Sequence, residues 1–234
     1  MILKKVLIFG ATGGLGIELC LKFLKNNYLV MGTSTSNKKI QDTRKKFKKL
    51  KLNNMLWKKC DVRSESKLRN TLKYFFKKEG HIDNIVICSG FPRYDGVKKI
   101  NYKNLENDFK INVFSNIIIN SEIMKLKRKN KKTTVVNIGS SSSYQGFKNT
   151  ISYCSSKHAL LGAIQSINSE CISENLYNTC VSMGSMKTLM GKKVVGQKYK
   201  FFIDPAKISD YIFFISNLKI GAYIEDIFFK RSKM

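Results

Sequence analysis

Long apolar runs are missing from this sequence, and so is any cysteine pattern that would bind a metal or form a disulfide framework. No apolar stretch among the 234 residues is long enough to cross a bilayer. The first apolar strand pattern begins at Lys4, so we expect no secretory signal peptide before it. The six cysteines are scattered without metal-ligand spacing. These absences predict a cytoplasmic protein with reduced thiols, without a metal and without a membrane segment.

Proline is nearly absent too, with Pro92 and Pro205 as the two examples in the chain. The sequence contains no linker-like segment, no internal repeat and no break in composition. A chain of 234 residues is long enough to bury one full hydrophobic core. We therefore predict that residues 1–234 form a single domain.

Acidic residues are scarce: 16 Asp and Glu accompany 43 Lys and Arg, which gives a formal net charge of +27. Such an excess attracts polyanions at low salt. The lysine clusters are nevertheless spread along most of the chain, and aromatic residues do not alternate with them to form a base-stacking surface. Asn and Ile are also abundant, which indicates an AT-rich genome. We favour this compositional origin of the charge and expect no specific nucleic-acid partner.

Strand and helix patterns alternate along the chain, which is typical of a parallel sheet covered by helices on both faces. The pattern predicts a doubly wound α/β fold of Rossmann type with a seven-stranded, mostly parallel sheet. One long amphipathic helix is expected over residues 104–127, and a later helix is expected to end near residue 174. The first two strands are expected at 4–10 and 28–33. The third is expected near 55–57 and ends at 60–62, and the others are expected at 83–88, 133–138, 178–182 and 222–229.

Capping residues predict three helix ends. Ser64 is suited to an N-cap, and Gly80 is suited to a left-handed C-terminal stop. Asp204 followed by Pro205 is an N-cap with proline at the first helical position. We therefore expect helices that begin just after Ser64 and Asp204, and a helix that ends at Gly80.

A glycine-rich turn joins the first predicted strand to the first predicted helix. Gly10, Gly14 and Gly16 lie within this turn. Gly10 permits a tight turn, Gly14 lets the backbone approach a phosphate, and Gly16 allows close packing of helix on strand. Backbone N–H groups and the positive end of the helix dipole meet there, which predicts a pyrophosphate site. The alternative, an ordinary glycine turn, is less favoured because a strand and a helix flank the turn correctly.

Tyr153 and Lys157 lie four residues apart, which places both side chains on one face of a helix. A nearby ammonium favours the phenolate and lowers the pKa of a phenol from its usual value near 10. The pair can therefore serve proton transfer near neutral pH. Tyr-x-x-x-Lys alone is common on solvated helix faces, so its meaning depends on the rest of the chain.

These features together resemble the short-chain dehydrogenase/reductase family over essentially the whole chain. The family's Gly-x-x-x-Gly-x-Gly corresponds to the glycine-rich turn. Its catalytic Ser lies thirteen residues before its Tyr, and Ser140 stands at that distance from Tyr153. The remaining matches are Asp61 and Val62 on the adenine side, Asn112 in the fourth helix, and Lys157 of the Tyr-x-x-x-Lys pair.

The resemblance implies interconversion of a ketone and a secondary alcohol by hydride transfer, with a nicotinamide cofactor. In the family, the residue at Tyr153 is the general acid or base, and the one at Ser140 orients the substrate oxygen. Lys157 would lower the phenol pKa and bind the nicotinamide ribose, while Asn112 would hold a water that links Lys157 to solvent. The implied cofactor contacts are Gly10, Thr12, Gly13, Gly14, Leu15, Gly16, Thr33, Ser34, Asp61, Val62, Ser89, Gly90, Tyr153, Lys157, Gly184 and Thr188.

Three positions depart from the family pattern. After the fourth strand the family has Asn-Asn-Ala-Gly. This chain has Ile87-Cys88-Ser89-Gly90 there, so the final glycine is the one residue that matches. The Pro of Pro-Gly after the sixth strand is Met183, and the Thr before the first glycine is Phe9. These changes concern loop rigidity and cofactor contacts, so we expect them to affect cofactor affinity more than the chemistry.

The loop after the second predicted strand bears on the choice of cofactor. Residues 33–39 read Thr-Ser-Thr-Ser-Asn-Lys-Lys and contain no acid. An acidic residue there would bind the ribose 2′-hydroxyl of NAD and repel a 2′-phosphate. The hydroxyls of Thr33 and Ser34 and the nearby lysines suit a phosphate, so NADP(H) is favoured over NAD(H). The alternative is a loop that is merely solvated.

Within the family, the compact length and residues 32–36 resemble bacterial 3-oxoacyl-[acyl-carrier-protein] reductases. Two basic carrier-docking positions of those enzymes correspond to Lys131 and, with the opposite charge, Glu174. The substrate, a small ketone or alcohol that is free or carried by a carrier protein, is expected at residues 146–153 and 186–202. A surface-sugar biosynthetic dehydrogenase is the competing enzyme, and a non-catalytic dinucleotide- or polyanion-binding protein is the alternative outside enzymes. The resemblance also implies a homo-oligomer, either a dimer or a tetramer.

Overall fold

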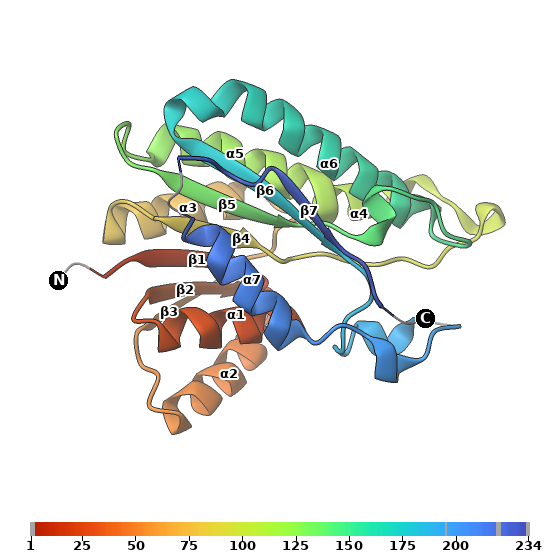
Figure 1. Cartoon of the computed structure of the whole chain (residues 1–234), viewed down its shortest axis with the longest axis horizontal. Coiled ribbons are helices and arrows are strands. Elements are labelled where there is room, and N and C mark those ends of the chain that lie inside the picture. The colour runs from red at the N-terminus through yellow and green to blue at the C-terminus, as the bar shows by residue number, and fades with distance from the viewer. Residues whose placement is uncertain (1–2, 195, 219–220, 233–234) are drawn as a thin grey trace.

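A seven-stranded sheet forms the centre of the computed structural model, which describes residues 3–194, 196–218 and 221–232 (Figure 1). Its strands are β1 (Lys5–Phe9), β2 (Leu29–Ser34), β3 (Met55–Lys59), β4 (Asn84–Ile87), β5 (Thr133–Ile138), β6 (Leu176–Met183) and β7 (Asp226–Phe229). They lie in the order β3-β2-β1-β4-β5-β6-β7, and every neighbouring pair is parallel. The predicted doubly wound sheet is confirmed, and in the described residues it is parallel throughout.

The strand order reverses between β1 and β4, since β2 and β3 extend to one side of β1 and β4 to β7 extend to the other. At such a switch point the connections leave the two strands in opposite directions, which opens a crevice beyond their carboxyl ends. The glycine-rich turn follows β1, and Ser89 and Gly90 follow β4. The topology therefore places these two predicted cofactor segments side by side.

Two layers of helices cover the sheet, one on each face (Figure 1). Val6 and Ile8 of β1 pack in the layer of α1, α2 and α7, whereas Leu7 and Phe9 pack in the layer of α3, α5 and α6. This alternation follows from the two-residue period of a strand, and it buries both faces of the sheet. The helices are α1 (Gly14–Lys25), α2 (Asn37–Lys49), α3 (Glu65–Glu79), α4 (Tyr102–Phe109), α5 (Ser115–Leu126), α6 (Ile151–Cys171) and α7 (Pro205–Ser216).

The capping residues fulfil most of their predicted roles. The Ser64 hydroxyl accepts a hydrogen bond from the backbone N–H of Lys67, and Asp204 caps α7 with Pro205 in the first turn. Gly80 ends α3 with a φ of 72°, but its ψ of −123° lies outside the left-handed helical region. The predicted left-handed stop is therefore wrong in ψ, although the positive φ still explains why a glycine stands there.

The expected single helix over residues 104–127 is interrupted. It consists of α4, a π-helical turn at Lys110–Phe114, and α5. A π-turn inserts one extra residue into a helix, and the buried Asn112 lies at its centre. The later helix also ends earlier than predicted, because α6 stops at Cys171 and a 3₁₀ turn continues to Glu174. The last strand is shorter than expected, since β7 begins at Asp226.

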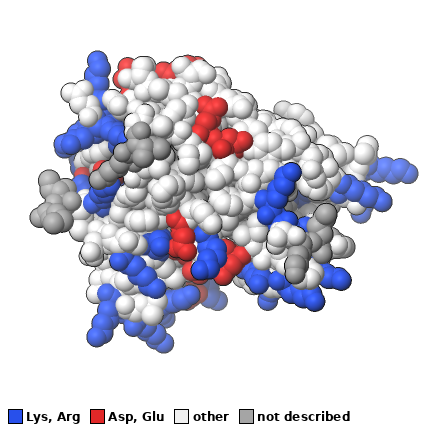
Figure 2. Space-filling view, in the orientation of Figure 1, with Lys and Arg blue, Asp and Glu red and all other residues white. Residues whose placement is uncertain are grey.

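Basic side chains lie around the rim of the face shown in Figure 2, and acidic side chains form a few small groups on it. This distribution agrees with lysine clusters that are spread along the sequence rather than gathered in one segment. Within the described ranges, no helix combines the length and apolar character that a membrane span requires.

Candidate active site

The glycine-rich turn after β1 has the tight geometry that the sequence predicts. Gly10 has a φ of 81°, and a Cβ there would lie 2.9 Å from the backbone nitrogen of Ser89. A Cβ on Gly16 would overlap the carbonyl oxygen of Gly10, so α1 can pack this closely on β1 only with glycine. Gly13 precedes α1, whose first N–H groups have no partner inside the helix. Free N–H groups at a helix N-terminus are suited to binding an anion.

The loops after β2 and β3 border this turn. Thr12 of the glycine-rich turn and Ser34 at the end of β2 share a hydrogen bond of 2.8 Å between their hydroxyls. Thr33 is buried, and its hydroxyl has no hydrogen-bond partner among the described residues. After β3, the Asp61 carboxylate accepts hydrogen bonds from the Arg63 guanidinium, with a shortest distance of 2.7 Å. The predicted adenine-side pair is completed by Val62, which is buried beside Asp61.

The segment after β4 lies over the centre of the site. Ser89 approaches Gly10, and its enclosed hydroxyl has no hydrogen-bond partner within the described part of the chain. A Cβ on Gly90 would lie 3.6 Å from the Asn112 amide oxygen and 3.8 Å from the Lys157 ammonium. The structure therefore brings Gly90, Asn112 and Lys157 together, although they are far apart in sequence.

Asn112 is fully buried and binds backbone rather than Lys157. Its amide oxygen accepts a hydrogen bond of 3.0 Å from the N–H of Phe91, and its amide nitrogen donates to the Phe91 carbonyl oxygen at 3.1 Å. The same nitrogen donates to the hydroxyl of Ser156 at 3.0 Å. Asn112, at the centre of the π-turn, thus joins the loop after β4 to α6.

Lys157, Tyr153 and Ser140 meet at the carboxyl end of β5. The Lys157 ammonium donates a hydrogen bond of 2.7 Å to the carbonyl oxygen of Ile138, the last residue of β5. Its nitrogen lies 5.9 Å from the centre of the Tyr153 ring. Ser140 is buried two residues after β5, and its hydroxyl accepts a hydrogen bond of 3.1 Å from the N–H of Ser142. The Ser140 hydroxyl is close enough to the Tyr153 phenol to lower the pKa of that phenol.

Burial dominates the titration of these groups. It raises the pKa of Tyr153 to about 12, and the Ser140 hydroxyl acts in the opposite direction. Burial also lowers the pKa of Lys157 from 10.5 to about 8. The predicted lowering of the Tyr153 pKa by Lys157 is therefore wrong for this structure, because the loss of hydration raises that pKa and outweighs the Ser140 hydrogen bond. At neutral pH Tyr153 carries its proton, as a proton donor must.

The segment after β6 closes over the glycine-rich turn. A Cβ on Gly14 would lie 2.5 Å from the Thr188 methyl group, so Thr188 occupies the space above that glycine. The Thr188 hydroxyl accepts a hydrogen bond of 3.0 Å from the N–H of Gly191. A Cβ on Gly184 would lie 3.2 Å from the side chain of Arg231, which follows β7. Gly14 and Thr188, two predicted cofactor residues, are thus in direct contact.

Exposed apolar side chains surround this end of the sheet. They belong to loops that follow β4, β5 and β6 and to the start of α6, the regions in which the sequence places the substrate. The segment after β6 also carries five lysines at positions 187–200 and no acid. An apolar rim with a basic flank suits a substrate with both apolar and anionic parts. The rim residues are Phe91, Tyr94, Tyr144, Phe147, Ile151, Leu189, Met190 and Tyr199.

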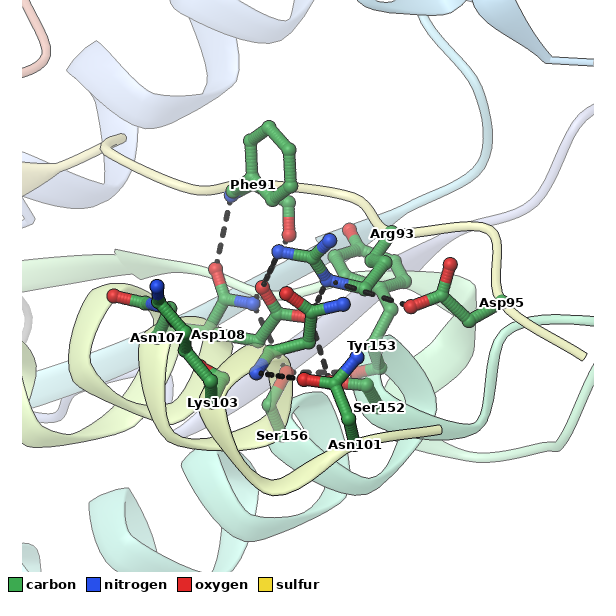
Figure 3. Close-up of polar contacts among 12 residues, drawn as sticks. Phe91, Arg93, Asp95, Asn101, Lys103, Asn107, Asp108, Ser152, Tyr153 and Ser156 are labelled. Atoms are coloured by element: carbon green, nitrogen blue, oxygen red, sulfur yellow. Dashed lines mark hydrogen bonds and ion pairs between the residues drawn. The ribbon is translucent and has the colours of Figure 1, made fainter. Parts of the chain in front are cut away.

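Sequence reasoning missed several polar residues of the site. The buried Asp108 and Ser152 form a cluster with the partly exposed Arg93 next to Tyr153, with hydrogen bonds of 2.6 to 3.1 Å (Figure 3). A signal was present in the sequence, because Asp108 precedes Asn112 by one helical turn and therefore faces the same side. The Tyr144 hydroxyl donates a hydrogen bond of 2.5 Å to Asp226 at the edge of the rim.

Known enzymes of the same fold superpose on the whole chain. An actinorhodin polyketide ketoreductase with NADPH has a TM-score of 0.87 at 17% identity, covering 98% of this chain and 96% of that chain. The NADP-bound structure of ElxO has a TM-score of 0.83 at 23% identity, covering 96% of this chain and 97% of that chain. At these identities the likeness establishes the fold alone.

Sequence relatives and a family match complete the comparison. The 3-oxoacyl-[acyl-carrier-protein] reductase of Buchnera aphidicola subsp. Schizaphis graminum is 27% identical over 197 residues, 84% of this chain and 79% of the relative. The diacetyl reductase of Staphylococcus epidermidis is 21% identical over 224 residues, 95% of this chain and 86% of the relative. Residues 4–198 match the short chain dehydrogenase family. The chain therefore belongs to the short-chain dehydrogenases, and it is an oxidoreductase that acts on CH–OH or carbonyl groups.

Proposed function

We propose that this protein is an NADP(H)-dependent reductase of a ketone, with Tyr153 as the general acid. The observation that carries the proposal is the convergence of Tyr153, Ser140 and Lys157 beside Gly90 at the switch point of the sheet. A dinucleotide bound along the glycine-rich turn would end near these three side chains.

The residues around the glycine-rich turn fit a dinucleotide. Gly10 and Gly16 hold the turn against α1, so backbone N–H groups converge on one point, where a pyrophosphate would lie. The hydroxyls of Thr33 and Ser89 lie at the ends of β2 and β4 without hydrogen-bond partners among described residues, and a ribose can supply such partners. Asp61 and Val62 lie on the adenine side, with the Asp61 carboxylate oriented by Arg63.

The catalytic side chains have distinct tasks. The bound nicotinamide would supply a hydride to the carbonyl carbon of the substrate. Tyr153 would donate its phenolic proton to the alkoxide oxygen that results, and its raised pKa keeps that proton in place until it is needed. Ser140 would donate a hydrogen bond to the same oxygen. Lys157, fixed to the Ile138 carbonyl, would place a positive charge beside the forming phenolate.

The preference for NADP(H) rests on the end of β2. Ser34 and Thr33 stand where an acidic residue would select NAD, and Thr12 holds Ser34 in place through the 2.8 Å hydrogen bond. Lys38 and Lys39 at the start of α2 are exposed and uncommitted to described acids, so they can approach a 2′-phosphate. A hydroxyl-lined loop with nearby lysines supports phosphate recognition without an arginine clamp.

The residues around the site favour one class of ketone among the many that short-chain dehydrogenases reduce. The apolar rim and its basic flank support a ketone with an acyl chain and a phosphate or carboxylate, as a carrier-bound 3-oxoacyl thioester would have. Glu174 lies in the turn after α6, and the 18 residues from Tyr153 to Cys171 span about 27 Å at 1.5 Å per residue. Lys131 lies at the same end of the sheet, just before β5, whose first residue Thr133 bonds to the Asn175 carbonyl oxygen. A carrier protein that serves this active site would therefore dock on the rim, or on Lys131 of another copy of the chain.

The test is oxidation of NADPH and NADH by the purified protein with acetoacetyl thioester, diacetyl and a keto-sugar nucleotide as parallel substrates. We expect turnover with NADPH and the thioester, and slower turnover with NADH. Turnover with the keto-sugar nucleotide alone would move the assignment to a sugar dehydrogenase. Binding of NADPH without turnover of any ketone would contradict the proposal.

A further inference from the structure

Asp108 has no accessible surface, although it is a carboxylate in the last turn of α4. It accepts two hydrogen bonds from the Arg93 guanidinium, at 2.8 and 3.1 Å, and a third of 2.6 Å from the Ser152 hydroxyl (Figure 3). Arg93 lies in the loop after β4, and Ser152 lies in the first turn of α6. A buried carboxylate is costly unless such bonds satisfy it, so this cluster holds three segments in one arrangement.

A second set of bonds runs parallel to the first. Asn112, four residues after Asp108, bonds to both backbone groups of Phe91 and to Ser156, which is four residues after Ser152. We call the two sets, Arg93–Asp108–Ser152 and Phe91–Asn112–Ser156, the two-rung clamp. Each rung starts in the loop after β4, crosses the α4 and π-turn segment, and ends on α6.

The clamp touches the proposed reaction site at both ends. Ser152 directly precedes Tyr153, and the Ser156 hydroxyl donates a hydrogen bond of 2.8 Å to the Tyr153 carbonyl oxygen. On the loop, Arg93 directly precedes Tyr94, an exposed residue of the rim. The clamp therefore connects the proton donor to a wall of the substrate site.

We propose that Asp108 is a positioning residue, which fixes the loop carrying Phe91 and Tyr94 at a set distance from Tyr153 through Arg93 and Ser152. The proposal rests on the function proposed above for Tyr153. Arg93 presents two N–H groups to Asp108 in a fixed plane, which sets orientation as well as distance. An apolar residue of similar size would fill the same space, but it would leave Ser152 without its carboxylate partner and Arg93 with Asp95, on its own loop, as its ion-pair partner.

The experiment compares Asp108→Asn with a matched control, Glu122→Gln. Glu122 is also a buried carboxylate bound to an arginine, at 2.6 Å from Arg69, but it lies on α5 away from the clamp. The readouts are the Tm, the Kd for NADPH, and kcat and KM for the best ketone substrate. Ser152→Ala and Ser152→Thr extend the series, because threonine keeps the hydroxyl.

We expect Asp108→Asn to lower kcat by about 10- to 100-fold, since small displacements of reacting groups have effects of that size. The Kd for NADPH should change little. Glu122→Gln should lower the Tm to a similar extent while kcat stays within about twofold of the wild type. Ser152→Ala should lower kcat and Ser152→Thr should restore part of it. Equal kcat and KM in wild type and Asp108→Asn would overturn the proposal.

Hydrogen exchange separates this proposal from the function on which it rests. In Asp108→Asn, exchange should increase together in residues 91–95 and in the first turn of α6, and Glu122→Gln should leave both unchanged. If the wild-type protein reduces no ketone, the proposed function is wrong. The hydrogen-exchange comparison would still test whether Asp108 holds the two segments together. Unchanged exchange in both segments of Asp108→Asn would overturn the clamp.

Discussion

Single side chains at the end of β5 decide the proposed chemistry. Tyr153 carries its proton at neutral pH because burial raises its pKa to about 12, and Lys157 gives up its proton more easily because burial lowers its pKa to about 8. The two shifts have one cause, the loss of water around both groups. At neutral pH Tyr153 keeps its proton and Lys157 is still mostly charged, which are the protonation states that the proposed proton donor and its positive partner require.

Replacement of Lys157 tests this burial directly through stability. The folded protein binds the Lys157 proton more weakly than the unfolded chain, since the pKa falls from 10.5 to about 8. The stability that this residue contributes is therefore fully present above about pH 10.5 and is lost as the pH falls through about 8. The stability of the wild type relative to Lys157→Met should rise by about 3 kcal/mol between about pH 7 and about pH 10.5.

Urea unfolding of both proteins across that pH range measures the difference. Lys129→Met removes the same charge from an exposed position and serves as the control. A wild-type advantage that is the same at every pH would contradict the burial of a titrating Lys157.

At the scale of elements, segments that are distant in sequence build the site together. The turn after β1, the loop after β4, the π-turn and the segment after β6 all converge at the carboxyl edge of the sheet. The contact between Thr188 and Gly14 is the tightest of these junctions, because the Thr188 methyl fills the place of a side chain on Gly14. This junction brings the segment after β6 to the proposed pyrophosphate position.

A methyl group on Gly14 should therefore collide with Thr188. Gly14→Ala should destabilise the protein by about 1–3 kcal/mol through overpacking, or displace the segment after β6 and weaken NADPH binding. Adding Thr188→Ser removes the colliding methyl and keeps the hydroxyl that accepts from Gly191, so the double variant should recover part of the loss. The free energies of unfolding and the NADPH affinities of Gly14→Ala, Thr188→Ser and the double variant give the interaction energy between residues 14 and 188. Strictly additive effects would show that the two residues are independent.

The sequence predicts much at this scale because strand and helix periods are local. The strands, the cap at Ser64 and the turn at Gly10 depend on neighbouring residues, and the structure confirms them. The π-turn around Asn112 depends on Phe91, 21 residues earlier, and on Ser156, 44 residues later. Periodicity carries no information on such distant partners, so the interruption of the long helix could not be predicted from it.

The same reason explains what was missed in the site. Tyr153, Ser140 and Lys157 could be identified because their spacing repeats a family motif. Asp108 and Arg93 belong to no family motif. They pair because the fold brings the loop after β4 next to α4, which the sequence pattern does not indicate. The raised pKa of Tyr153 also depends on packing around the ring, which no spacing in the sequence encodes.

The whole molecule combines one continuous sheet with a formal net charge of +27. Basic side chains lie around the rim of the face shown in Figure 2, and 43 Lys and Arg in the chain outnumber 16 Asp and Glu. Mutual repulsion of this kind opposes the compact state without altering the fold. That residues 1–234 unfold as a single domain stays a prediction.

Added salt should therefore stabilise the protein. Raising NaCl from about 20 mM to about 300 mM shortens the Debye length to below the spacing of most surface charges, which weakens the repulsion. We expect the Tm to rise by a few degrees, as measured by circular dichroism at constant pH and protein concentration. A Tm that falls with salt would contradict this expectation, because it would mean that ion pairs such as Lys22–Asp210 and Arg69–Glu122 outweigh the repulsion.

Tyr153→Phe tests the central claim most directly, because it removes one oxygen atom and leaves the ring in place. NADPH affinity by fluorescence and ketone reduction by NADPH oxidation should be measured on the wild type and on this variant. We predict unchanged NADPH binding and a loss of turnover by about 100-fold or more. Turnover close to that of the wild type, with NADPH still bound, would contradict the assignment of Tyr153 as the proton donor.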